Sequence, residues 1–251
     1  MVTHKRNRQA SKMINSDLQA LITTLQMAGL TTIILLIIGT PLAWYLAKMT
    51  SRFKVVIEAI VALPLVLPPT VLGFYLLIAF SPEHLPGQLW QQATGQQLAF
   101  SFSAIVIGSV LYSLPFVVQP LQKAFEQLGD SLLEAGALLG AGPIDRFFSI
   151  VFPLTKASFI TAASLGFAHT VGEFGVILMI GGNIPGETRV LSIALFDHVE
   201  AFDYARAHVL SISLLIGSML LLAAIYWLNL PKRNLKNKVM RKNSMEHHAN
   251  D

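Results

Sequence analysis

Residues 18–47 read LQALITTLQMAGLTTIILLIIGTPLAWYLA and contain no Asp, Glu, Lys or Arg. A helix needs about 20 predominantly apolar residues to cross the hydrocarbon core of a bilayer, so this stretch is long enough to span a membrane. The apolar part of a secretory signal peptide is only about 7–15 residues long and leads to a cleavage site of small residues. Residues 40–47 instead continue in apolar sequence, which indicates a retained helix.

Four more segments resemble this stretch in composition. They cover residues 57–80, 98–122, 157–181 and 207–230. Of the 251 residues, 53% are apolar and only 13% are charged, whereas soluble domains carry roughly 25% charged residues. Buried helices of a soluble protein would need polar faces, and none of the five segments has one. The sequence therefore predicts an all-α, polytopic membrane protein with five transmembrane helices in one domain over residues 17–230.

The basic residues predict how the helices are oriented, because cytoplasmic loops are enriched in Lys and Arg. Twelve of the 18 basic residues fall between the first and second spans, between the third and fourth, or after the fifth: Lys48, Arg52, Lys54, Lys123, Arg146, Lys156, Lys232, Arg233, Lys236, Lys238, Arg241 and Lys242. Residues 231–251 are then a basic cytoplasmic tail, and five spans place the N-terminus outside. The N-terminal tail, residues 1–16, conflicts with this orientation because it carries four basic residues.

The loop between the third and fourth spans has the most specific pattern. Residues 130–153 read DSLLEAGALLGAGPIDRFFSIVFP, which predicts a helix, a glycine-rich turn and a second helix. Gly140 or Gly142 can adopt the positive φ that ends the first helix. Pro143 is suited to the first turn of the next. An ordinary amphipathic connector is the alternative interpretation.

The same loop resembles the EAA loop of the membrane subunits of ABC importers. That motif has Glu-Ala-Ala, a Gly after three residues, and Ile-x-Leu-Pro after nine more. Here Gly136 replaces the second Ala and Phe152 replaces the Leu, while both spacings match. The resemblance implies the MetI-like fold of ABC-importer permeases. It also implies that the loop couples to a cytoplasmic ATPase through Glu134, Ala135, Gly136, Gly140, Arg146, Ile150 and Pro153.

Two further segments make the resemblance more specific within the ABC-importer permeases. LPLVLPPTVLG at residues 63–73, and GEFG followed by GNIPGETR within residues 172–189, are similar to segments of molybdate-transporter permeases and their sulfate relatives. The resemblance covers residues 17 to 230 and favours molybdate. It implies a homodimer in a bacterial inner membrane, with two ATPase subunits and a periplasmic molybdate-binding protein. Sulfate, thiosulfate or tungstate remain alternative substrates.

Polar and helix-breaking residues within the spans are candidates for the pathway. Pro64, Pro68 and Pro69 remove backbone donors and predict a kinked or unwound second span, which is tolerated where it lines a cavity or packs against protein. His169 and Glu173 are four residues apart, so a continuous helix would place them on one face as a pathway or structural pair. A carboxylate is a poor ligand for a dianion, so Glu173 suits packing or gating. The pathway and gate candidates are Pro68, Pro69, Thr70, His169, Thr170, Glu173 and Asn183.

Other classes of function find little support in the sequence. The chain has no G-x-x-x-x-G-K-[ST] motif, so ATP hydrolysis is expected on a separate subunit. Its histidines show no metal-ligand spacing, it has no cysteine, and no cofactor is expected. The net charge of +4 is explained by loops at a lipid bilayer, without nucleic acid. An intramembrane enzyme that uses His169 and Glu173, or a structural membrane protein, are the rival hypotheses.

Overall fold

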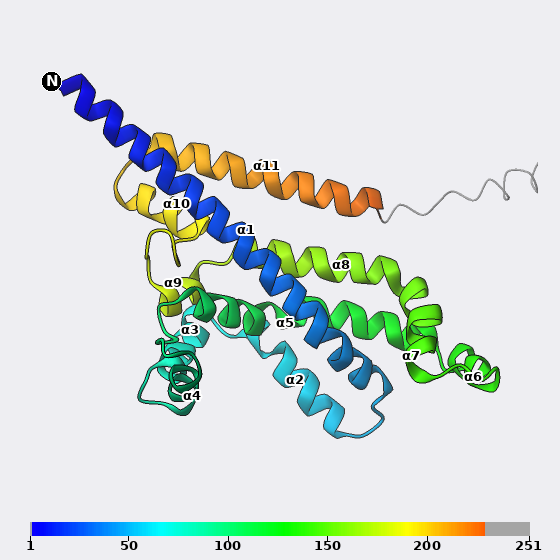
Figure 1. The fold of residues 1–251 in the computed structure, drawn as a ribbon. Helices are drawn as coiled ribbons and strands as arrows, with labels where there is room; N and C mark the ends of the chain where they lie inside the picture. Colours follow the sequence, from blue (N-terminus) through cyan, green and yellow to red (C-terminus); the bar gives the residue numbers. More distant parts are fainter. Residues whose placement is uncertain (1, 229–251) are drawn as a thin grey trace, which may run out of the picture.

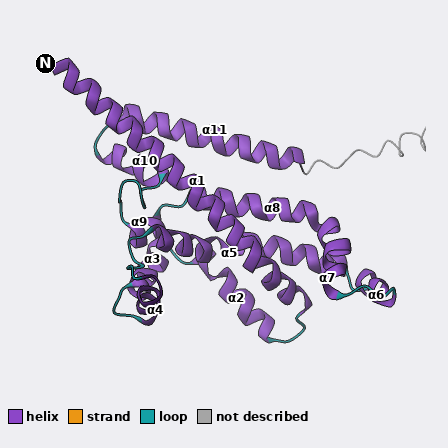
Figure 2. Ribbon diagram, viewed as in Figure 1, coloured by secondary structure: helices purple, strands orange, loops and turns teal. Residues whose placement is uncertain are grey.

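The computed structural model describes the backbone of residues 2–228 and the side chains of residues 15–227. All regular structure in this range is helical (Figures 1 and 2). The helices are α1 (Val2–Lys48), α2 (Phe53–Val66), α3 (Pro69–Phe80), α4 (Leu85–Thr94), α5 (Phe102–Leu128), α6 (Ser131–Leu138), α7 (Pro143–Arg146), η1 (Phe147–Val151), α8 (Phe152–Val171), α9 (Gly175–Gly181), α10 (Leu191–Glu200) and α11 (Tyr204–Leu228). The prediction of an all-α chain is confirmed for these residues.

Helices α1, α5 and α8 pack together to form the centre of the molecule (Figure 1). Small residues allow their close approach, as is common between membrane helices. A Cβ atom on Gly166 of α8 would lie 2.8 Å from Cγ2 of Val117 on α5, and one on Gly39 of α1 would lie 3.2 Å from Cγ1 of the same valine. Val117 is fully buried, so the three helices meet around this side chain.

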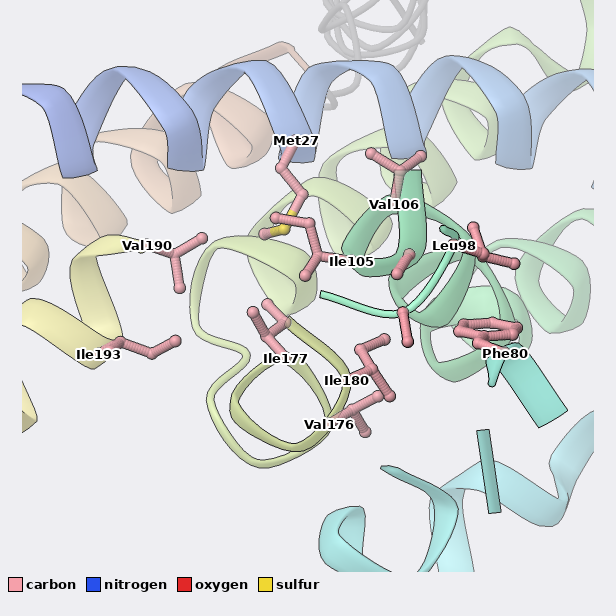
Figure 3. Close-up of a cluster of buried hydrophobic side chains, with 12 residues drawn as sticks. Met27, Phe80, Leu98, Ile105, Val106, Val176, Ile177, Ile180, Val190 and Ile193 are labelled. Carbon is pink, nitrogen blue, oxygen red and sulfur yellow. The ribbon is translucent and has the colours of Figure 1, made fainter. Parts of the chain in front are cut away.

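A second buried cluster joins the opposite end of this bundle to the shorter helices. Figure 3 shows Met27 of α1 facing Ile105 of α5, with Ile177 and Ile180 of α9 close by. The cluster also includes Phe80, Leu98, Val106, Val176, Val190 and Ile193. The broken segments after α2 and α8 are therefore anchored by apolar packing at the same end of the bundle.

The second predicted span is broken, as its prolines indicate. Helix α2 ends at Val66, Leu67 is extended, and α3 begins at Pro69, so that the two helices make an angle of 109°. Pro68 lacks the N–H that a continuous helix would need, and Pro69 occupies the first turn of α3, where a missing donor costs nothing.

The fourth predicted span differs from the structure. The sequence predicts one helix over residues 157–181, but the continuous helix starts at Pro143 and ends at Val171, and α9 is a separate helix. Gly172 still has right-handed helical angles, and the chain leaves the helical path after it, at Phe174, which adopts φ −129° and ψ −54°. Glu173, one of the candidate site residues, lies in this break.

Among the described residues, four helices are long and apolar enough to cross a membrane, and a fifth span is counted if α2 and α3 are taken as one broken span. The four are Asn15–Lys48, Phe102–Leu128, Pro143–Val171 and Tyr204–Trp227. The predicted N-terminal tail is helical from residue 2 and continues directly into the first span. The predicted basic tail, residues 231–251, lies outside the described residues.

Candidate functional site

The loop of residues 130–153 folds as a helix, a tight turn and a second helix that continues into α8. The Ala141 N–H donates to the Gly136 carbonyl at 3.0 Å, and the Gly140 N–H donates to that of Ala137 at 2.9 Å. This is the Schellman pattern that closes a helix through a residue of positive φ. Gly140, with φ +84°, is that residue, whereas Gly142 is extended and Pro143 begins α7.

Two positions of the loop motif contact each other. A Cβ atom on Gly136 would lie 2.8 Å from Cδ1 of Ile150 and 3.3 Å from Cγ of Arg146. The absence of a side chain at residue 136 therefore lets α6 lie directly on η1. Arg146 also donates from Nη1 to the Leu133 carbonyl at 3.2 Å, so its guanidinium stabilises the loop from within.

The outer surface of the loop is apolar and exposed. Leu138 and Leu139 are each 89% exposed, Ile144 is 75% exposed and Phe148 is 64% exposed. We call these four residues the coupling knob. Glu134, Ala135 and Pro153 are exposed beside it. An apolar patch of this kind at the end of a molecule marks a site of protein or membrane contact.

Ion pairs connect neighbouring helices at the same end of the molecule as the coupling knob. Lys48 at the end of α1 pairs with Asp130, which precedes α6. Lys54 of α2 pairs with Glu126 of α5 at 2.7 Å, and the Gln122 amide donates to Glu58 at 2.6 Å. Lys54, Glu58, Gln122 and Glu126 line a cavity of about 470 Å³ between α2 and α5. The spacing in the sequence could have indicated part of this network. Lys54 and Glu58 are four residues apart, as are Gln122 and Glu126, and this spacing places each pair on one face of a helix.

His169 is held firmly between α8 and α5. Its Nδ1 lies 2.8 Å from Oγ of Ser113, which lies 3.1 Å from Oγ1 of Thr170. The ring stacks on Phe116 at 4.0 Å between centroids and leans against Tyr112 at 4.9 Å. The structure therefore brings together two predicted candidates, His169 and Thr170, around a serine that the sequence analysis did not select.

Glu173 is not a partner of His169, and the prediction of one shared helix face is wrong. Its carboxylate accepts a hydrogen bond from the Val176 N–H at 2.8 Å, and its carbonyl accepts one from Ser192 at 2.6 Å. The residue is only 6% exposed. It satisfies a free donor at the start of α9, as capping side chains do. The helix break explains the error, because the four-residue spacing no longer means a shared face.

The remaining pathway candidates fall in two other places. Pro68 lies in the α2–α3 break, and Pro69 and Thr70 begin α3. A Cβ atom on Gly175 would lie 2.7 Å from Cβ of Pro69. Asn183 belongs to the loop before α10, and its amide donates to both carboxylate oxygens of Asp197 at 3.0 and 2.9 Å.

Asp197 is the centre of a polar cluster at the end of the molecule opposite the coupling knob. It also pairs with Arg189 at 2.9 Å, and Arg189 donates to Ser16 of α1 at 3.0 Å. Asp17 and His198 make a further contact at 3.1 Å. Sequence analysis missed this cluster because residues 16 and 17 are far from residue 197 along the chain. Within the described residues, no group of three His, Asp or Glu side chains could hold a metal ion.

Comparison with known proteins identifies the family and the relatives that this chain resembles. Residues 39–230 match the family described as binding-protein-dependent transport system inner membrane component. The molybdenum transport system permease protein ModB of Azotobacter vinelandii is 58% identical over 210 residues, which cover 84% of this chain and 93% of the relative. A probable sulfate transport system permease protein of Anthoceros angustus is 34% identical over 218 residues, or 87% of this chain and 75% of the relative.

A solved structure is also similar. It is the crystal structure of a bacterial alginate ABC transporter in complex with an alginate pentasaccharide-bound periplasmic protein. The TM-score is 0.64, with 87% of this chain and 78% of the other chain covered, at 15% sequence identity. At this identity the similarity concerns the fold alone.

Proposed function

The chain belongs to the inner membrane components of binding-protein-dependent transport systems, and from this membership we propose that it is the membrane-spanning subunit of an ATP-driven molybdate importer. The fold similarity confirms the predicted MetI-like permease fold. The chain is a multi-pass protein of the bacterial inner membrane and a transport subunit rather than an enzyme. The observation that carries the choice of substrate is the 58% identity to the molybdenum permease.

The coupling knob supports a role for residues 130–153 in docking a cytoplasmic ATPase. Four large apolar side chains are exposed there, although buried contacts hold the loop beneath them in a fixed shape. An exposed apolar patch on a rigid support needs no reorganisation before a partner binds, so little conformational entropy is lost. We assign Glu134 and Ala135 to the rim of this contact, and Gly136, Gly140, Arg146, Ile150 and Pro153 to the support or edge of the knob.

Two copies of the chain would surround the pathway. One face of α5 supports this proposal, because Tyr112, Phe116, Gln119 and Lys123 follow at helical spacing and remain partly or fully exposed. We call these residues the α5 stripe. An aromatic and polar stripe is costly against lipid, but it suits the wall of a water-filled path. A second copy would face this stripe and close the path.

The orientation is proposed with the coupling knob on the cytoplasmic side. The knob, the last residues of α1 and the last residues of α11 lie toward one end of the molecule, and the start of α1 lies at the other (Figure 1). This arrangement supports a cytoplasmic C-terminus and an external N-terminus. The loop before α10, which contains Asn183, would then face the periplasmic receptor that delivers the oxyanion.

Uptake by reconstituted vesicles tests the proposed substrate. The full chain, its ATPase and its receptor are incorporated or supplied together, and ATP-dependent uptake of labelled molybdate is measured with sulfate or tungstate as competitor. We expect saturable uptake that excess sulfate leaves nearly unchanged. Efficient competition by sulfate, or uptake without ATP, would contradict the proposal.

Replacement of Glu134 tests the coupling contact. Glu134→Arg reverses a charge at the rim of the knob without touching the contacts between Gly136 and Ile150, and we expect loss of the ATPase on co-purification. Glu83→Arg, an exposed site outside the loop, is the matched control and should retain the ATPase. If the Glu134 variant keeps its partner at the level of the control, the docking assignment is wrong.

A further inference from the structure

The cavity between α2 and α5 lies at one end of the α5 stripe. Its volume is about 470 Å³. Gln119 and Lys123, the last two members of the stripe, line it from α5, whereas Lys54 and Glu58 line it from α2. This is the end of the stripe nearer the coupling knob, so in the proposed orientation the cavity belongs to the cytoplasmic end of the transport path.

Four charged side chains line the cavity, and their charges cancel. Lys54 and Lys123 are positive at neutral pH, whereas Glu58 and Glu126 are negative. The other lining residues are uncharged: Val61, Ala62, Gln119 and Gln122. The cavity is therefore polar but has no net charge.

Three of the four charged groups belong to one cluster. Nζ of Lys54 lies 2.7 Å from Oε1 of Glu126 and 3.8 Å from Oε1 of Glu58. The Gln122 amide donates to the same two oxygens, at 3.0 Å to Glu126 and at 2.6 Å to Glu58. One lysine is thus shared by two carboxylates, so the cluster carries a net charge of −1.

Lys123 supplies the charge that balances this cluster. It is exposed, and it precedes Glu126 by three residues on α5, which places the two side chains on neighbouring positions of one helix face. Within the described part of the chain its ammonium makes no ion pair. It is therefore the cation of the cavity that an anion can approach directly.

The net charge of such a cavity controls how a dianion passes through it. The Coulomb energy of a dianion with each unit charge is twice that of a monovalent ion. An excess of lysine would retain the dianion, whereas an excess of carboxylate would repel it. Conduction requires binding that is favourable enough for entry and weak enough for release. A neutral cavity with one unpaired ammonium meets both requirements.

We propose that Lys54, Glu58, Lys123 and Glu126 form a charge-balanced exit for the oxyanion, in which Lys123 receives the dianion and the two carboxylates limit how long it is held. The inference rests on the proposed function, because it requires the α5 stripe to face the transport path. In the proposed dimer each copy contributes one such cavity. Glu58 and Glu126 then have a role in releasing the substrate as well as in joining α2 to α5.

Equilibrium binding without the receptor tests the charge balance. The full chain with its ATPase in lipid nanodiscs is titrated with labelled molybdate at low ionic strength. Glu126→Gln keeps an acceptor oxygen for Lys54 and Gln122 but leaves one positive charge in excess, so it should raise the affinity by about fivefold. Lys123→Gln leaves one negative charge in excess and should lower the affinity by a similar factor.

The double variant Lys123→Gln/Glu126→Gln provides a readout that a merely structural role would not give. Its cavity is neutral again, so its affinity should return to within about twofold of the wild type, whereas independent structural losses would add. The differences between variants should also shrink at about 1 M salt, where the Debye length is only about 3 Å. Single variants that shift the affinity in the same direction, or a double variant no closer to the wild type than they are, would overturn the proposal.

Lys156→Gln is the matched control. Lys156 is an exposed lysine of α8 that does not line the cavity, so its loss should leave the affinity unchanged. A change as large as that of Lys123→Gln would mean that the overall charge of the protein, rather than the cavity, controls binding, and would contradict the proposal.

Uptake measured in parallel separates the two proposals. ATP-dependent uptake of molybdate by the wild-type complex, together with unchanged affinity in both single variants, would leave the proposed function intact and contradict the charge-balanced exit. Absence of ATP-dependent uptake by the wild-type complex would contradict the proposed function itself. Retention of the ATPase and an unchanged unfolding midpoint establish that each variant is folded before its binding is compared.

Discussion

The break between α2 and α3 and the break between α8 and α9 lie against each other, but they are built from different chemistry. The first uses Pro68 and Pro69, which remove backbone donors from the helix. The second retains all its donors, and Glu173 supplies the acceptor that the start of α9 needs. Gly175 of the second break touches Pro69 of the first. One break is thus imposed by covalent structure, whereas the other depends on a side chain.

We expect the largest loss of stability when the contact between the two breaks is disturbed. Gly175→Ala adds a Cβ atom at 2.7 Å from Cβ of Pro69, a ring atom that cannot rotate away. Overpacking of this kind costs about 1–3 kcal/mol, to be measured by reversible unfolding in mixed micelles. Gly29→Ala is the matched control, because nothing lies within 4 Å of its added atom. Equal stability of the two variants would mean that the breaks do not touch.

Loss of the Glu173 cap should reduce the stability of the protein by an intermediate amount. Glu173→Ala leaves the Val176 N–H without its acceptor and should destabilise the protein by about 0.5–2 kcal/mol in the same assay. Glu173→Gln keeps an acceptor oxygen and should retain most of the stability.

The same variant distinguishes the cap from the predicted pair with His169. If Glu173 acts only on α9, the effects of Glu173→Ala and His169→Phe on unfolding free energy should add to within about 0.5 kcal/mol. A larger coupling energy between Glu173→Ala and His169→Phe would mean that the two side chains interact, as the sequence predicted.

The smallest effect is expected at the proline break. Pro69→Ala restores one donor in the first turn of α3, where that donor has no partner within the helix. The change should cost only about 0.4–1 kcal/mol, because it mainly increases the conformational entropy of the unfolded chain. Pro68 and the extended Leu67 remain to separate α2 from α3. A loss of stability larger than that of Glu173→Ala would contradict this ranking of the two breaks.

The difference between the proline break and the glycine break explains which parts of the structure could be predicted from the sequence. The proline break was predicted, since proline lacks a donor in every context. The glycine break was not, because Gly172 and Gly175 are tolerated within membrane helices and residues 157–181 remain uncharged apart from Glu173. The turn at Gly140 and the start at Pro143 followed from local backbone rules. The Ser113–His169 contact joins residues 56 positions apart, and no local pattern determines such a pair.

The π-helical segment η1 has a mechanical consequence. It joins α7 to α8 without a break, so one helix extends from Pro143 to Val171. Ile144 in the coupling knob and His169 lie on this same helix, about 38 Å apart at 1.5 Å per residue. If a partner docked on the knob moved it, as the proposed function requires, the displacement would be carried to the level of His169 by one continuous helix. The hydrogen-bond register of this helix changes in the wider turn of η1, Phe147–Val151, which lies between Ile144 and His169.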